Sequence, residues 1–432
     1  MASGNALHAH TRFLIFHTEK PAFWIKPPPI HPKAVRLSHN YSFFIIHYSF
    51  TKGGAVMKKL YKSLPTVIFV IFIAAMFVLF LAMPKNEYSP SEKRILEQAP
   101  AFTGEKLVSG EFGEHFEKFL SDQFAGRNLW VGLASYYQLS IGNNGANGVY
   151  KGADGYLIND PEDMSGLMRN IGFIEEFAQH VDVPTTVMIA PSTGYICADK
   201  LPSVHKPYQD DEYFEKIAEA LNTADFVDVR DTFKAAYASG EQLYYKTDHH
   251  WTAVGAYTAY TALADALGYT ANSRDAYEVT SYDGFYGTTY SSSGFWLNEP
   301  DSIEVWDNKA NDGHLHVAIT DNGETTEQDD MFYYSHLEED DKYPVYLDGN
   351  HPYTVITNDN ASSDEKLLVV KDSFAHSFVP FLADHYAEII MVDMRYYTNP
   401  LPELVESEGV DRVLFLYSVD NLATDDKIAF IE

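Results

Sequence analysis

The chain is organised around one short polar stretch, Lys246-Thr247-Asp248-His249-His250-Trp251. Asp248 precedes His250 by two residues, so on an extended segment the two side chains point to the same side. The carboxylate can accept a hydrogen bond from one imidazole nitrogen and hold the other nitrogen ready as a base. An apolar helix pattern follows at 252–267. The stretch therefore predicts an acid–base pair just before the N-terminus of a helix.

The nucleophile that suits this pair is Ser373, in the stretch Lys371-Asp372-Ser373-Phe374. A buried-strand pattern at 367–370 runs into this serine, and a helix pattern at 374–385 follows it. Such a strand–turn–helix context presents a hydroxyl at the edge of an α/β sheet. Because a helix begins there, the backbone amide of Ser373 or Phe374 would stabilise a developing oxyanion. The predicted triad is Asp248, His250 and Ser373.

Three further residues are candidates for oxyanion or substrate contacts. Ser192 follows a strand pattern at 185–190, and ligands gather at the carboxyl ends of such strands, although turn chemistry is the alternative. Arg395 follows a strand pattern at 388–393 and is either a substrate contact or half of a structural ion pair. Trp251, directly after the acid–base pair, is the third candidate.

A metal site is the main alternative use of this stretch. Asp248, His249 and His250 would then join His376 or His385 as ligands. Adjacent side chains on an extended segment point to opposite faces, so only one of the two neighbouring histidines enters a given site. Phosphoesterases with an Asp-His-His motif also need aspartate motifs on other strands, which cannot be placed in this sequence. We therefore predict no metal and no other cofactor.

The flanking sequence alternates short apolar strands with helices. Strand patterns lie at 185–190, 226–229, 367–370, 388–393 and 412–417, and helix patterns at 164–179, 210–222, 231–238, 252–267, 374–385 and 401–408. This order predicts an α/β fold, a mainly parallel sheet with helices on both faces. Residues 274–365 interrupt it and predict a β-rich insertion that covers the site. The aromatic residues of the insertion either stack on sugar rings or pack internally; they are Phe285, Tyr286, Tyr290, Phe295 and Trp296.

Charge is distributed unevenly along the 432 residues. Residues 1–84 hold nine Lys and Arg against one acid, whereas residues 85–432 hold 22 basic and 60 acidic residues. So acidic a body would repel phosphate, which argues against nucleic acid as a partner. It suits a neutral or cationic substrate, or simply solubility outside a cell. The single cysteine, Cys197, excludes an internal disulfide framework.

The N-terminal region has the features of a membrane anchor. An apolar segment from Leu64 to Met83 is long enough to span a bilayer, and Lys58, Lys59 and Lys62 precede it. The positive-inside rule then places the N-terminus in the cytoplasm and the rest of the chain outside the membrane. A cleaved signal peptide is the alternative. We predict a single-pass protein of the cell membrane with an extracytoplasmic catalytic domain.

This interpretation gives four segments. Residues 1–56 are either a mis-annotated start, since Lys-Gly-Gly before Met57 resembles a translated ribosome-binding site, or a disordered extension. Residues 57–85 hold the lysine cluster and the transmembrane anchor. Residues 86–146 predict a helical membrane-proximal segment, and residues 147–432 the catalytic domain.

Three blocks resemble one known family, the DHHW proteins. They are Thr247–Trp251, Gly148–Leu157 and Lys371–Phe374. That family is similar to the SGNH-hydrolase-like O-acetyltransferases of the alginate type, in which an Asp-x-His-Trp motif and a later serine form the triad. The resemblance implies these roles for Asp248, His250 and Ser373, in an order that differs from ordinary SGNH hydrolases, where the serine comes first.

The resemblance also implies an activity and partners. The protein would be a membrane-anchored O-acetyltransferase that acts on a cell-surface or secreted polysaccharide. A multi-pass membrane-bound O-acyltransferase would supply the acyl group, because no acetyl-CoA exists outside the membrane. Two alternatives remain open: an acetylesterase that uses the same triad with water as acceptor, and a non-catalytic glycan-binding or assembly protein.

Overall fold

The computed structural model describes residues 54–431, with side chains from Ser63 onward. The predictions made for residues 1–53 therefore lie outside the described part. Helix α1 (Gly54–Ala82) contains Ser63–Ala82, which by length and composition is apolar enough to cross a membrane, with a mean hydropathy of 2.9. This span agrees with the apolar segment read from the sequence.

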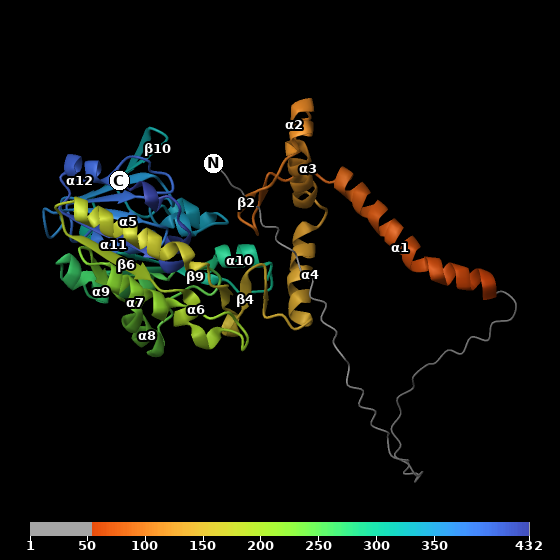
Figure 1. The fold of residues 1–432 in the computed structure, drawn as a ribbon, viewed down its shortest axis with the longest axis horizontal. Helices are drawn as coiled ribbons and strands as arrows, with labels where there is room; N and C mark the ends of the chain where they lie inside the picture. The colour runs from red at the N-terminus through yellow and green to blue at the C-terminus, as the bar shows by residue number, and fades with distance from the viewer. Residues whose placement is uncertain (1–53, 432) are drawn as a thin grey trace, which may run out of the picture. The chain divides into compact units, whose positions relative to one another are not determined.

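An eight-stranded sheet forms the centre of the domain (Figure 1). Its order is β11 (Glu324–Gln328), β10 (Leu315–Asp321), β12 (Tyr353–Asn358), β14 (Glu388–Val392), β13 (Lys366–Lys371), β15 (Arg412–Ser418), β6 (Thr185–Ala190) and β7 (Asp225–Val227). The five strands from β14 to β7 are parallel, and β12, β10 and β11 extend the sheet with antiparallel pairings. The predicted α/β class with a mainly parallel sheet is confirmed.

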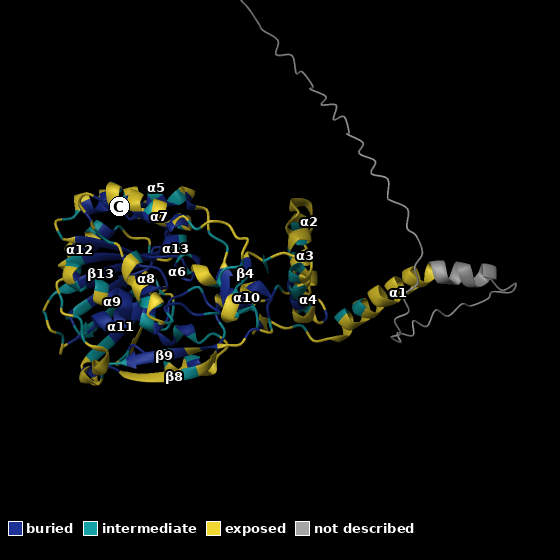
Figure 2. Cartoon of the chain, turned by 90° about the horizontal axis from the view of Figure 1, so that it is seen from below, coloured by how far each residue is buried: buried dark blue, intermediate teal, exposed yellow. Residues whose placement is uncertain are grey.

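Helices cover both faces of the sheet, which explains why its central strands are almost wholly apolar. On β13, Leu367 and Val369 pack with α9 (Ala253–Leu267) and α11 (Ala375–Leu382), whereas Leu368 and Val370 face the other layer. That second layer contains α5 (Leu167–His180), α7 (Asp210–Ala220), α12 (Leu401–Glu408) and α13 (Val419–Thr424). Figure 2 shows buried residues concentrated in the strands and exposed ones on the outer sides of the helices. Two further helices, α6 (Thr193–Ile196) and α8 (Arg230–Ala238), lie with the α9 layer.

The insertion at 274–365 differs in part from its predicted role as a cover. Strands β8 (Glu278–Phe285) and β9 (Asp301–Asp307) do form a separate antiparallel pair. The helix α10 (Thr288–Ser293), which lies between them in the sequence, contacts Asp248 through Thr288. Strands β10 to β12, however, join the central sheet and lengthen it. Phe285, Tyr290 and Phe295 are buried, which agrees with the prediction that these rings pack internally and not with the alternative that they stack on sugar rings.

The segment at 86–146 is mainly helical, as its pattern predicts. It contains α2 (Gly104–Ser109), α3 (Glu111–Asp122), α4 (Arg127–Ser140) and the short strands β1 (Tyr88–Ser89) and β2 (Arg94–Ile95). The Arg94 guanidinium donates to both carboxylate oxygens of Asp122, at 2.8 and 2.6 Å. Gly132 on α4 lies against the Trp296 ring, so this segment packs on the insertion. A small antiparallel sheet follows, formed by β3 (Gly145–Ala146), β4 (Val149–Lys151) and β5 (Leu157–Asn159).

Candidate active site

The carboxyl edge of the parallel strands brings together three side chains that are distant in sequence. Ser373 stands two residues after β13, and His250 stands three residues before α9. Nδ1 of His250 lies 2.5 Å from Oδ1 of Asp248, and Nε2 lies 2.6 Å from Oγ of Ser373. All three side chains are buried, with Ser373 the most exposed of them at 8 %. The structure thus places Asp248, His250 and Ser373 in one continuous line of hydrogen bonds.

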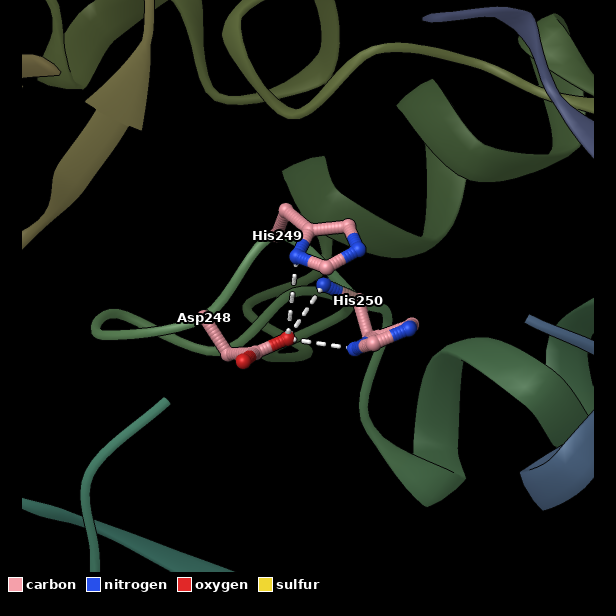
Figure 3. A group of neighbouring side chains, drawn as sticks. All are labelled: Asp248, His249 and His250. Atoms are coloured by element: carbon pink, nitrogen blue, oxygen red, sulfur yellow. Dashed lines mark hydrogen bonds and ion pairs between the residues drawn. The ribbon is translucent and has the colours of Figure 1, made fainter. Parts of the chain in front are cut away.

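The Asp248 carboxylate accepts hydrogen bonds on both oxygens. Figure 3 shows the interactions of one of these oxygens with His249 and His250. Oδ1 accepts from the backbone N–H and the ring of His250, and Oδ2 accepts from the backbone N–H and hydroxyl of Thr288, at 2.6 and 3.1 Å. Burial alone would raise the pKa of Asp248, but the charges of the His250 and His249 rings outweigh burial and hold it well below its usual range. The group is therefore ionised at neutral pH.

An ionised carboxylate only accepts hydrogen bonds, and this fixes the tautomer of the imidazole. Nδ1 of His250 carries the proton that it donates to Asp248, and Nε2 is left to accept from the Ser373 hydroxyl. A base aligned in this way can remove the proton of a serine during nucleophilic attack.

Residues that the sequence did not point to hold the imidazole in place. The Tyr343 ring stacks on His250, with centroids 3.9 Å apart and an interplanar angle of 10°. Its hydroxyl donates to the backbone carbonyl of Ser373 at 3.1 Å, so one side chain fixes both members of the pair. Tyr343 and Thr288 both come from the insertion, and no local pattern marks either of them.

Gly287 leaves the space that the Asp248 side chain occupies. A Cβ atom at Gly287 would lie 2.1 Å from Cβ and 2.2 Å from Oδ2 of Asp248, far inside van der Waals contact. Only a residue without a side chain lets the Thr288 amide approach that carboxylate.

We expect Gly287→Ala to slow the reaction of Ser373 with an activated ester by about 10²-fold in kcat/KM, because displacing the carboxylate misaligns the imidazole. Steady-state kinetics check this, with the melting temperature as a record of folding. The matched control is Gly172→Ala on α5, where an added methyl meets no atom within 4 Å. Equal activity of both variants would contradict the role of Gly287.

The other sequence candidates separate into distinct environments. The Ser192 hydroxyl donates to Asp210 at 3.0 Å and does not join the triad. Arg395 pairs with Asp393 at 2.8 Å, which agrees with the ion-pair alternative. Trp251 has no exposed surface and donates to the carbonyl of Phe374 and the hydroxyl of Ser377, both at 3.0 Å. Its predicted substrate contact is therefore wrong, because the ring is part of the core that supports the serine turn.

The oxyanion prediction also changes in one respect. The Phe374 amide donates to Oδ1 of Asp372 at 2.9 Å and is thus already engaged. Asp372 in turn accepts from the backbone N–H of Ser418 at 2.8 Å and from the Asn421 amide at 2.7 Å, which fastens the turn to β15 and α13. Of the two amides expected at this position, that of Ser373 remains the candidate.

The side chains that would bind a metal ion at this site are largely engaged in hydrogen bonds. Asp248, His249 and His250 do place ligand atoms within 4.8 Å of one another. Both ring nitrogens of His250 are nevertheless engaged, by Asp248 and Ser373. The two other histidines considered as ligands are engaged elsewhere: Nε2 of His376 accepts from Lys371 at 2.7 Å, and Nε2 of His385 contacts the Tyr260 hydroxyl at 2.6 Å. The geometry fits a hydrogen-bonded triad better than a coordination shell.

Two family models and several solved structures are similar to this chain. The model of the DHHW protein family matches residues 232–392, and that of the SGNH hydrolase-like domain of acetyltransferase AlgX matches residues 164–288. A DHHW family protein from Eubacterium siraeum is 23 % identical, with a TM-score of 0.55 over 65 % of this chain and 94 % of that one. Bacillus cereus PatB1, solved with a sulfonyl adduct, is 23 % identical, with a TM-score of 0.56 over 65 % and 97 %.

No curated protein sequence matches this chain. The structural similarities establish a shared fold, and the family match covers both the Asp-His-His-Trp motif and Ser373. On these findings residues 232–392 match the DHHW protein family, residues 164–288 match the SGNH hydrolase-like domain of acetyltransferase AlgX, and the chain shares the fold of a solved DHHW family protein.

Proposed function

We propose that this protein is an O-acetyltransferase that moves an acetyl group onto a polysaccharide through an acyl-serine intermediate. The observation that carries the proposal is the line of hydrogen bonds from Asp248 through His250 to Ser373, at 2.5 and 2.6 Å. Nucleophile, base and orienting carboxylate within hydrogen-bond reach are what acyl transfer by a serine requires.

In the first half-reaction, Oγ of Ser373 attacks the carbonyl carbon of the acyl donor while Nε2 of His250 takes the hydroxyl proton. The Ser373 amide donates to the oxyanion that forms. Collapse of the tetrahedral intermediate breaks the bond to the leaving group, which takes the proton from His250. Asp248 keeps the imidazole in its tautomer and stabilises the imidazolium meanwhile.

In the second half-reaction, a sugar hydroxyl gives its proton to Nε2 of His250 and attacks the acyl-serine. The serine oxygen leaves and recovers the proton, and the acetyl group is now an ester on the sugar. Water in place of the sugar would give hydrolysis, so exclusion of water in favour of a bound sugar separates a transferase from an esterase.

The location of the reaction is part of the proposal. Ser63–Ala82 would anchor the chain in the cell membrane, with the lysines before it in the cytoplasm and the catalytic domain at 147–432 outside. The helical segment at 86–146 would then stand next to the membrane. An acyl donor is needed on that side, and a multi-pass membrane-bound O-acyltransferase would deliver it.

The experiment is to trap the intermediate on the full-length protein in detergent. After exposure to p-nitrophenyl acetate, peptide mass spectrometry is expected to find an acetyl group on Ser373, and a sulfonyl fluoride should block that modification. Adding an oligosaccharide acceptor should convert the acetyl-serine into acetylated sugar. Release of acetate with no acetylated sugar would favour the esterase, and an unmodified Ser373 would refute both activities.

A further inference from the structure

A cavity of about 200 Å³ lies at the carboxyl edge of β6 and β15, and neither Ser373 nor His250 is among the residues that line it. Phe374 and His249 form part of its wall, and these residues are the chain neighbours of Ser373 and His250. Ser192, singled out in the sequence, also lines it. The volume equals that of about seven liquid waters, which suits one sugar unit rather than a longer chain.

One carboxylate oxygen in this cavity has no partner. Oδ1 of Asp420, at the start of α13, is shielded from solvent and accepts no hydrogen bond from any residue in the described part of the chain. The neighbouring Asp210 differs, because it accepts from the backbone N–H of Ser192 at 2.7 Å and from its hydroxyl at 3.0 Å. A buried, unpaired carboxylate oxygen is costly, so the position of Asp420 calls for a donor from outside the chain.

The electrostatics of the cavity restrict that donor. Burial, reinforced by the charges of Asp210 and Glu162 and only partly offset by a side-chain hydrogen bond from Ser192, raises the pKa of Asp420 to about 7. Among the described residues, no Lys or Arg lines the cavity. Above that pH a carboxylate on a ligand would meet like charge without compensation, whereas a hydroxyl or an amino group would relieve the unpaired oxygen.

One wall of the cavity is a fixed aromatic ring. The Tyr208 hydroxyl donates to the carbonyl of Asn159, and a Cβ at Gly194 would lie 2.1 Å from the ring. The ring thus sits directly on the backbone of α6 and cannot move toward it. A flat apolar wall combined with a few hydrogen-bonding groups matches the two kinds of surface that a sugar presents.

We propose that this cavity is the acceptor subsite and takes a sugar unit that carries no carboxylate, with a hydroxyl or amino group donating to Asp420. The proposal rests on the acyl-transfer function proposed above and specifies its acceptor: neutral or amino sugars are bound, and uronic acids are rejected.

The test measures binding without chemistry. Full-length Ser373→Ala protein in detergent is titrated calorimetrically with three sets of tetrasaccharides: neutral ones linked from glucose, galactose, mannose or N-acetylglucosamine; the glucosamine tetramer; and the galacturonic and mannuronic acid tetramers. At least one neutral or amino probe is expected to bind at least tenfold more tightly than any uronate.

Asp420→Asn, added to the Ser373→Ala protein, is expected to weaken the bound neutral or amino probe by about tenfold or more. The same change removes a negative charge that is repelled by Asp210 and Glu162, so the melting temperature should equal or exceed that of the parent. This readout separates lost binding from lost folding. Asp426→Asn is the matched control, because that side chain is 78 % exposed and lies outside the cavity.

Three outcomes would overturn the proposal. They are binding of a uronate as tight as that of the best neutral or amino probe, absence of binding by every neutral and amino probe, and an affinity that Asp420→Asn leaves within twofold. If the subsite binds as expected in the Ser373→Ala protein while the wild-type protein forms no acetyl-serine, the acyl-transfer function alone is refuted.

Discussion

Ser373→Ala is expected to lower kcat/KM for acetyl transfer by about 10⁴-fold or more. The substitution removes the proposed nucleophile, the Oγ that lies 2.6 Å from Nε2 of His250. The residual rate would come from binding and oxyanion stabilisation alone. Kinetics with an acetyl ester donor and an oligosaccharide acceptor measure the loss directly, and mass spectrometry should find no acetyl-enzyme.

Ser407→Ala is the matched control for this substitution. Ser407 is exposed on α12, and its hydroxyl bonds only to the Leu404 carbonyl of the same helix, at 3.3 Å. We expect wild-type rates for this variant. If Ser373→Ala kept more than about a tenth of the activity while Ser407→Ala behaved normally, another group would have to be the nucleophile.

Asp248→Asn is expected to cost about 10⁴-fold in kcat with little change in the fold. The four groups that hydrogen-bond to this side chain are all donors: two from His250 on one oxygen and two from Thr288 on the other. An amide places its own N–H₂ against one of those pairs. Either the imidazole takes the wrong tautomer, or the Thr288 amide, at 2.6 Å, faces a second donor.

The same carboxylate also links activity to pH-dependent stability. Because its folded-state pKa lies below the ordinary value, its contribution is present above the unfolded pKa of about 3.9. That contribution is lost as the pH falls through the lower folded value. Denaturant unfolding across acidic pH should therefore show a weaker acid dependence in Asp248→Asn. Asp265→Asn, on the exposed side of α9, is the control and should keep the wild-type profile.

The central strands could be predicted closely because both of their faces are covered. Residues 185–190 form β6 with the predicted bounds, and all six are buried. β10 was not assigned to the sheet, since Leu315–Asp321 alternates apolar and polar residues in the way of a strand covered on one face. Nothing in that alternation says which neighbour the strand pairs with.

In the candidate site, too, local patterns could be predicted and contacts made by tertiary folding could not. Two-residue spacing was enough to align Asp248 with His250, and the strand–turn–helix context was enough to select Ser373, whose catalytic role stays a prediction. The supports from Thr288 and Tyr343 could not be found, because they depend on how the insertion folds back. Trp251 was misjudged for the opposite reason: a motif position suggested function, whereas packing placed the ring in the core.

The distance along the chain between imidazole and hydroxyl has a consequence for the newly made protein. His250 and Ser373 are 123 residues apart, and the insertion that steadies them lies between. In an unfolded chain the serine is an ordinary alcohol with no base nearby, so it cannot be acylated prematurely. In the proposed mechanism the serine becomes reactive only when folding has brought these two distant side chains together. Activity therefore depends on completion of folding.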